Sequence, residues 1–164
     1  MSATTTTCSR TLVALDIDGT LVGEGNRIPS GTVEELDLVR AAGHEAVLAT
    51  GRSLIGLVPI AIRLGLTDSW GVCSNGALTV RLDPSAPSGY EVVAAHTFDP
   101  GPVIRRAMEI VPEVRVAVEE VGWGWRTNAP FEPGECSAPG LMETSKTRRI
   151  GSYVGTTEVP RRVA

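Results

Sequence analysis

Short apolar runs alternate with amphipathic stretches through the first half of the chain. The apolar runs are residues 11–15 (TLVAL), 45–49 (EAVLA) and 70–74 (WGVCS). Continuous apolar runs of this length are typical of strands that are buried on both faces of a parallel sheet.

The segments between these runs are predicted helices. Thr32 and Glu35 form a T-x-x-E capping box at the start of the first helix. Residues 54–64 form the second helix, in which Pro59 introduces a kink or delays the start. The order strand–helix–strand–helix–strand, with short connections, predicts an α/β fold with a partial Rossmann-like parallel sheet core over residues 11–78.

The pattern changes after this core. Residues 78–82 and 90–97 are predicted strands of an antiparallel hairpin, separated by a turn rich in Pro, Ser and Gly. Asp99 is the predicted cap of a further helix, and two strand-like segments follow it. Residues 79–134 are therefore predicted to be the beginning of an α+β cap domain.

Both ends of the chain lack a regular pattern. Residues 1–10 are polar and rich in threonine, without the apolar run of a secretory signal, and we expect a disordered leader. Residues 135–164 are rich in Gly, Ser, Thr, Pro and Arg and show no sustained period. They are predicted to form an irregular tail.

Composition narrows the classes of protein. The net charge of −4 argues against a nucleic-acid-binding protein, which usually carries a basic surface. No segment approaches the roughly 18 apolar residues that a membrane-spanning helix needs, so a membrane is not an expected partner either. The three cysteines, Cys8, Cys73 and Cys136, form no CxxC pair, and we expect a reducing, cytoplasmic location.

Two aspartates, Asp16 and Asp18, directly follow the first apolar run. Carboxylates so close together repel each other unless a cation lies near them, and Mg²⁺ is a hard cation that prefers oxygen ligands. One aspartate can then attack phosphorus and form an aspartyl-phosphate, while the other protonates the leaving oxygen and deprotonates the attacking water. The sequence therefore predicts a Mg²⁺-dependent phosphoryl-transfer site.

Polar turns also follow the second and third apolar runs, at residues 50–52 (TGR) and 74–76 (SNG). Ligands of an open parallel sheet bind beyond the carboxyl ends of its strands, so these turns are expected to meet the first one in a single crevice. Gly19, Thr50 and Gly51 are the predicted phosphate ligands, through backbone N–H groups, a hydroxyl and the positive end of the following helix.

Several polar residues keep two interpretations. Arg52 can contact the phosphate or be a solvated or structural arginine, and Asn75 can contact the substrate or only hold its turn. Thr50 can also be a plain helix cap. Glu119 and Glu120 are expected at a solvated strand edge.

Three of these segments resemble the motifs of one enzyme family. LVALDIDGTL resembles motif I (DxDGT) of the haloacid-dehalogenase-like superfamily, VLATGR resembles its motif II, and CSNGAL resembles the segment that follows in the Cof-type sugar-phosphatase subfamily. The resemblance covers roughly residues 11–132. It implies that Asp16 is nucleophile and Mg²⁺ ligand. Asp18 would be the general acid/base and would give the metal its backbone carbonyl, and Thr50 would bind the phosphate of a small metabolite such as a sugar phosphate.

Two further motifs of that family have no counterpart. The resemblance calls for a motif III lysine and an acidic motif IV, but Lys146 is the only lysine and no aspartate follows Asp99. The pattern breaks at about residue 135, as expected of a truncated or frameshifted chain. We therefore expect impaired phosphatase activity, an exposed sheet edge and self-association. The alternatives are a non-catalytic phosphate- or Mg²⁺-binding module and a non-functional remnant.

Overall fold

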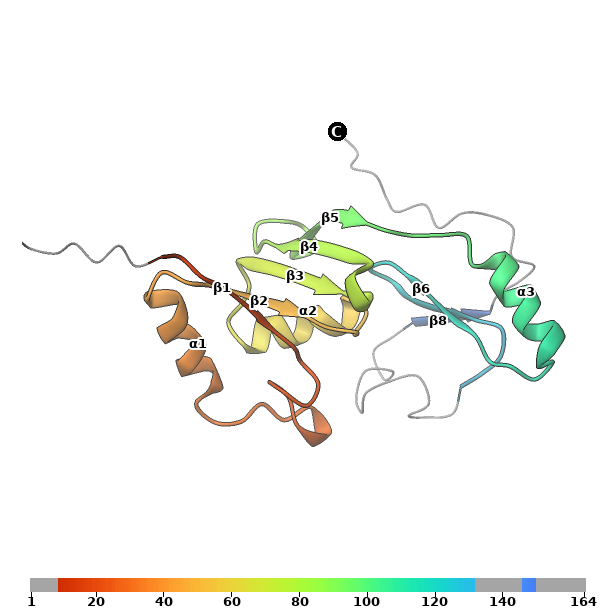
Figure 1. Ribbon diagram of the computed structural model, residues 1–164, viewed down its shortest axis with the longest axis horizontal. Helices are drawn as coiled ribbons and strands as arrows, with labels where there is room; N and C mark the ends of the chain where they lie inside the picture. The colour runs from red at the N-terminus through yellow and green to blue at the C-terminus, as the bar shows by residue number, and fades with distance from the viewer. Residues whose placement is uncertain (1–8, 132–145, 150–164) are drawn as a thin grey trace, which may run out of the picture.

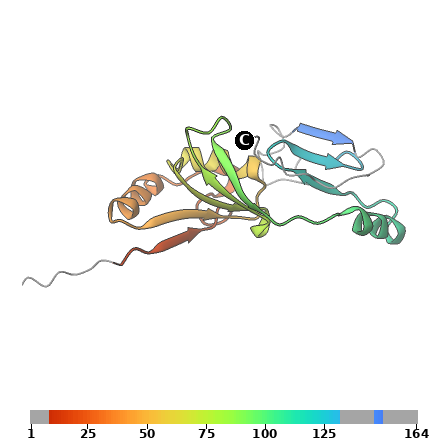
Figure 2. The same ribbon diagram turned by 90° about the horizontal axis from the view of Figure 1, so that it is seen from above.

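The computed structural model describes residues 9–131 and the backbone of residues 146–149. The strands form a five-stranded sheet in the order β1-β2-β3-β4-β5 and a three-stranded sheet in the order β6-β7-β8. The two sheets lie side by side, with α1 and α3 at opposite ends (Figures 1 and 2). The elements are β1 (Leu12–Leu15), α1 (Thr32–Ala41), β2 (Glu45–Ala49), α2 (Leu54–Arg63), β3 (Ser69–Cys73), β4 (Leu78–Leu82), β5 (Tyr90–Ala95), α3 (Gly101–Ile110), β6 (Ala117–Glu120), β7 (Gly124–Thr127) and β8 (Lys146–Arg149), with 3-10 turns at Glu24–Asn26 and Ser74–Gly76.

The first three strands form the predicted parallel core. β1 pairs with β2 and β2 with β3, all in parallel, and a helix connects each consecutive pair. Both connections step in the same direction across the sheet, so right-handed crossovers place α1 and α2 on the same face. The prediction of an α/β fold with a Rossmann-like sheet is confirmed.

The predicted hairpin belongs to this sheet. β4 pairs antiparallel with β3, and β5 pairs antiparallel with β4. Leu78, Val80 and Leu82 are at most 2% exposed, because they lie on the face that packs against the helices. The antiparallel pairing is as predicted. The predicted boundary between core and cap, after residue 78, falls inside β4 and therefore within this sheet. If the following residues belong to a cap domain, that domain would start after β5.

Helix α2 packs closely on the sheet. Leu54, Leu57 and Leu64 are fully buried. A Cβ atom on Gly71 of β3 would lie 3.1 Å from both terminal methyl groups of Leu57 and from a methyl group of Val80. Helix α2 therefore packs directly on β3, the central strand of the sheet, and this packing fixes the position of the first residues of α2.

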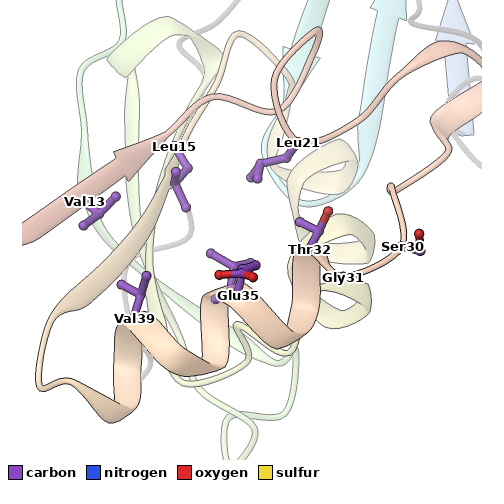
Figure 3. A pocket seen from close by; sticks show the side chains of 9 residues that line it. Val13, Leu15, Leu21, Ser30, Gly31, Thr32, Glu35 and Val39 are labelled. Atoms are coloured by element: carbon purple, nitrogen blue, oxygen red, sulfur yellow. The ribbon is translucent and has the colours of Figure 1, made fainter.

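Strand β1 differs from its prediction. Among the described residues it pairs only with β2, and Leu12 is 63% exposed, so it is an edge strand and not one buried on both faces. An open pocket of about 420 Å³ separates β1 from α1, with Val13 and Leu15 facing Val39 and Glu35 (Figure 3). An apolar run predicts a strand, but its burial depends on neighbours on both sides. Within residues 9–131 and 146–149, no strand pairs with the outer side of β1.

Two predicted helix starts have different outcomes. Gly31, with φ 89°, is the cap of α1 and no side chain caps it, so Thr32 is the first helical residue and the predicted capping box is wrong. The left-handed conformation of Gly31 turns the chain one residue earlier than the sequence pattern indicates. At α3 the cap residue is Pro100 and not the predicted Asp99, but Asp99 Oδ1 still accepts a hydrogen bond of 2.9 Å from the N–H of Gly101, the first helical residue.

The predicted irregular tail is wrong for residues 146–149. They form β8, which pairs in parallel with β7, and Lys146 lies opposite Gly124. The rest of the tail, from 150 onward and before 146, and most of the predicted leader lie outside the described residues. None of the helices that the structure describes is long and apolar enough to cross a membrane.

Candidate active site

The three polar turns follow the carboxyl ends of β1, β2 and β3. The second and third turns are joined by their backbones: Ser74 N–H donates to Arg52 O (2.7 Å), and Asn75 N–H donates to Thr50 O (3.3 Å). Parallel pairing brings these strand ends to one edge of the sheet. The expectation that these two turns meet is therefore met in the structure.

The first turn presents its two carboxylates outward. Ile17 is fully buried, and its carbonyl accepts hydrogen bonds from the N–H groups of Leu21 (3.1 Å) and Val22 (2.9 Å). Asp16 and Asp18 flank this buried residue, so both side chains are exposed. A buried residue between two polar ones thus anchors the turn and leaves both carboxylates accessible.

Arg52 joins the first turn to the second. Its Nε donates to Asp18 Oδ2 (2.8 Å) and its Nη2 to Asp18 Oδ1 (2.6 Å), a bidentate pair. Nη2 also donates to Asn26 Oδ1 (2.8 Å). The Arg52 side chain is only 4% exposed, so the interpretation as a solvated arginine is wrong. Its Nη1 is buried without a hydrogen-bond partner among the described residues.

This pair affects the acidity of Asp18. The hydrogen bond from Arg52 lowers the pKa of Asp18 below its ordinary value of 3.8; burial opposes the shift, and the positive charge of Arg52 adds to it. A general acid needs a proton to give near neutral pH, whereas this carboxylate is held ionised. In this arrangement the Asp18 carboxylate accepts hydrogen bonds from Arg52 and holds no proton that it could donate near neutral pH.

A pH dependence of stability follows from that shift. Because the folded-state pKa of Asp18 is depressed, its contribution is present above pH 3.8 and is lost as the pH falls through the lower folded-state value. The difference in melting temperature between the wild type and Asp18→Asn, in Mg²⁺-free buffer, should be largest at neutral pH and vanish in acid. Calorimetric melts from neutral pH to pH about 2 measure it. A difference that stays constant over that range would contradict this prediction.

The other residues of the second and third turns support the backbone. Thr50 Oγ1 accepts a hydrogen bond from the N–H of Arg52 (3.2 Å) within the turn, whereas the cap residue of α2 is Ser53, so the alternative of Thr50 as a plain helix cap is wrong. A Cβ atom on Gly51 would lie 3.0 Å from Asn75 Oδ1, so the Asn75 side chain packs against this glycine. Gly19, with φ 76°, allows the first turn its left-handed conformation. Local structural roles for Thr50 and Asn75 are therefore visible, and they do not prevent phosphate contacts.

The oxygen donors for a metal are few. Among the described residues, no group of three or more His, Cys, Asp or Glu side chains is arranged to hold a metal ion. The carboxylate of Asp18 is already paired with Arg52, which leaves that of Asp16. Mg²⁺ often keeps several waters and takes one or two carboxylates together with substrate phosphate, and this limited set fits only that mode.

Glu119 is a site residue that the sequence did not indicate. It belongs to β6, yet its Oε1 accepts a hydrogen bond from the N–H of Leu54 (3.0 Å) at the start of α2. Its Oε2 accepts one from the Ser74 hydroxyl. The expectation of a solvated strand edge is wrong for Glu119, because a contact across 65 residues leaves no local signal. Asn26, which accepts a hydrogen bond from Arg52, was not predicted either, because the two residues are 26 positions apart in the sequence.

The comparisons with known proteins agree with this geometry. A sequence model of the haloacid dehalogenase-like hydrolase family matches residues 13–118. A pyridoxal phosphate phosphatase of Escherichia coli K12 is 32% identical over 100 residues, which are 61% of this chain and 33% of that protein. This chain therefore spans about a third of the length of that curated relative.

Solved structures give the same answer for the fold. A haloacid dehalogenase-like hydrolase from Bacteroides thetaiotaomicron has a TM-score of 0.68 at 23% identity, over 87% of this chain and 52% of that one. A sugar phosphatase of subclass IIB has a TM-score of 0.62 at 24% identity, over the same shares of the two chains. With the family match covering most of the sheet and all three turns, this chain belongs to the haloacid dehalogenase-like hydrolase family.

Proposed function

We propose that this chain carries the nucleophile and the phosphate-binding turns of a phosphomonoester hydrolase that acts on a small phosphorylated metabolite. The observation that carries the proposal is the arrangement at the strand ends: an exposed Asp16 beside an Asp18–Arg52 pair whose buried guanidinium has a donor to spare. The names of the relatives, a pyridoxal phosphate phosphatase and a sugar phosphatase, support this substrate class.

The proposed reaction has two steps. A carboxylate oxygen of Asp16 attacks phosphorus, a new O–P bond forms, and the ester oxygen leaves with its electron pair. Water then attacks phosphorus, the bond between phosphorus and the Asp16 oxygen breaks, and inorganic phosphate leaves. Asp18 is ionised and can accept the proton of that water, although its lowered pKa makes it a weaker base than an ordinary aspartate. Asp18 can protonate the leaving oxygen in the first step only after it moves away from Arg52 and gains a proton.

The phosphate is proposed to bind at the second turn. Thr50 and Gly51 precede α2, whose first N–H groups form the positive end of the helix. Gly19 already donates its N–H to Val22 O (3.0 Å), so a contact of this group with phosphate would require that bond to open. The unpaired Nη1 of Arg52 supplies a charged donor, and a buried unpaired donor is rare in native proteins unless a ligand or water meets it.

Mg²⁺ is the proposed cofactor. The Asp16 carboxylate and the backbone carbonyl of Asp18 would hold it, with water and substrate phosphate as the other ligands. When bound, it would offset the negative charge of phosphate and nucleophile. Since Arg52 already neutralises Asp18, we expect the ion to bind weakly in the absence of phosphate.

The chain as it stands is expected to show little or no turnover. Among the described residues no three metal-binding side chains are clustered, and Arg52 already pairs with Asp18. Removing one preorganised electrostatic donor from an enzyme costs on the order of 10²–10³ in rate. Hydrolysis of an aryl phosphate and of sugar phosphates at saturating Mg²⁺, compared with the pyridoxal phosphate phosphatase of Escherichia coli, measures the difference. Turnover at the rate of that enzyme would contradict the expected impairment.

Formation of the phosphoenzyme tests the function itself, whatever the turnover. Intact-protein mass spectrometry after incubation with aryl phosphate and Mg²⁺ is expected to show one added phosphoryl group, and peptide mapping to place it on Asp16. No phosphorylation at Asp16, together with no turnover by this chain, would remove the proposed hydrolase function.

A non-catalytic phosphate- or Mg²⁺-binding module is the second candidate. The observation that favours it is that Arg52 neutralises Asp18 and the metal shell is small. Calorimetry with phosphate and Mg²⁺, run beside the phosphoenzyme assay, separates the two: binding without covalent phosphate favours the module. A non-functional remnant is the third reading. It requires a chain without a cooperative thermal transition, which the buried core makes unexpected.

The setting of the protein is also a proposal. We propose a cytoplasmic location and self-association through the exposed edge of β1, because its outer backbone groups lack a partner among the described strands. Nucleic acids and membranes are not proposed as partners. Sedimentation velocity over a range of concentrations tests self-association.

A further inference from the structure

The carboxylate of Glu119 lies where two of the phosphate-site turns meet. The carboxylate accepts hydrogen bonds from the N–H of Leu54 and from the hydroxyl of Ser74. Leu54 begins α2, two residues after Arg52. Ser74 belongs to the third turn and donates its backbone N–H to Arg52 O. β6 thus reaches back from the smaller sheet to the carboxyl end of β3 (Figure 1). Glu119 therefore places a negative charge next to the proposed phosphate turns.

Glu119 and Ser74 are among the residues that line a cavity of about 380 Å³ beside those turns. Most of its wall is apolar, with Leu78, Phe98 and Ile104 among the lining residues. The described lining includes Ser74 and His96 but neither lysine nor arginine, so no permanent cation on the wall neutralises Glu119. A charge in an apolar cavity is screened less than a charge in water.

The neighbouring thiol shows how far this charge acts. Burial raises the pKa of Cys73 to about 12, and the negative charge of Glu119 adds to that effect. Cys73 ends β3, directly before the third turn. Ser74, the residue after Cys73, donates its hydroxyl to Glu119, so this carboxylate lies beside the strand end at which the proposed substrate would lie.

We propose that Glu119 determines specificity: it favours phosphate esters whose leaving group carries a cation or a strong hydrogen-bond donor, and it excludes esters whose leaving group carries a second anion. The inference rests on the proposed function, since it places the phosphate at the turns and the leaving group in the cavity. A carboxylate that already accepts two hydrogen bonds keeps lone pairs for a further donor. A second anion in the cavity would meet an uncompensated like charge, which is a repulsive element of specificity.

Three phosphate esters with two-carbon leaving groups test this inference: 2-aminoethyl phosphate, ethyl phosphate and phosphoglycolate. Their dissociation constants are measured by calorimetry with the purified chain and Mg²⁺, together with inorganic phosphate. The cationic ester is expected to bind about tenfold more tightly than ethyl phosphate, and the anionic ester about tenfold more weakly. This order needs no substitution, so it does not depend on the folding of a variant.

Glu119→Gln isolates the charge. Its amide oxygen can accept from Leu54 N–H and its amide nitrogen can donate to Ser74, so both contacts are kept while the charge is lost. In this variant the ratios between the dissociation constants of the three esters should shrink to less than about threefold, and ethyl phosphate should itself bind more tightly, because a negative charge near the phosphate turns is removed. Glu120→Gln is the matched control, because Glu120 is the next residue of β6 and pairs with Arg126 (2.9 Å). It should keep the wild-type order.

The outcomes separate the inference from the proposed function. If all probes bind the wild type with equal affinity, or if Glu119→Gln keeps the wild-type order, the specificity role is wrong while the phosphate site stands. If neither inorganic phosphate nor any ester binds the wild type, the proposed phosphate site fails and the specificity role fails with it. A preference that disappears in Glu119→Gln and persists in Glu120→Gln supports the inference.

Discussion

Asp16→Asn is expected to form no phosphoenzyme and to lower any Mg²⁺-dependent hydrolysis to the background rate. An amide does not attack phosphorus as a carboxylate does, and removal of a nucleophile has cost on the order of 10⁶ in rate in a well-studied protease. Asp16 is exposed, so the melting temperature should stay close to that of the wild type. Rapid-quench single-turnover assays measure the rate of hydrolysis, and intact-protein mass spectrometry measures the amount of phosphoenzyme.

Asp37→Asn is the control for this substitution. Asp37 is an exposed aspartate of α1 that pairs with Arg40 (3.6 Å), away from the three turns. The control variant should form the phosphoenzyme as the wild type does. A covalent phosphate on Asp16→Asn, or an equal loss in both variants, would show that another residue is the nucleophile.

Leu57→Ala is expected to produce the largest loss of stability, about 2–5 kcal/mol in the free energy of unfolding. Leu57 is fully buried in α2, and its methyl groups fill the space above Gly71. Truncation leaves a cavity between helix and sheet that the neighbouring glycine cannot fill. Urea unfolding followed by circular dichroism measures the change.

Leu38→Ala is the matched control, because Leu38 of α1 is 64% exposed. Its loss should stay within about 0.5 kcal/mol, as for most surface substitutions. The comparison also bears on the site, since α2 begins two residues after Arg52 and its first residue, Leu54, donates its N–H to Glu119. Equal losses in the two variants would mean that α2 does not pack on the sheet as described.

The sequence by itself determined the parallel half of the fold. The strands β1, β2 and β3 and the helix α2 lie where the hydrophobic pattern placed them, within one or two residues. Local patterns suffice here, because short apolar runs and helical periodicity specify which elements form, and strand order follows from short right-handed connections. The same reasoning placed the second and third polar turns together at one sheet edge.

The candidate residues of the site were found from sequence for a similar reason. Asp16, Asp18 and Thr50 follow strands directly, and the carboxyl ends of parallel strands share one edge. Their chemical identity was therefore informative without knowledge of their contacts. Their catalytic roles remain the predictions stated above, to be decided by the phosphoenzyme and binding experiments.

Only the tertiary structure decided what these residues contact and how deeply the elements are buried. Arg52 pairs with Asp18 across 34 residues, and Glu119 reaches Leu54 across 65. The hairpin of β4 and β5 joins the core sheet, whereas β1 lies at its edge. The hydrophobic pattern of a strand does not specify which strands pair with it, and the sequence around a charged side chain does not specify its ion-pair partner. Burial, pairing and pKa are properties of groups brought together from distant parts of the chain, so they arise only when the whole sheet and its helices assemble.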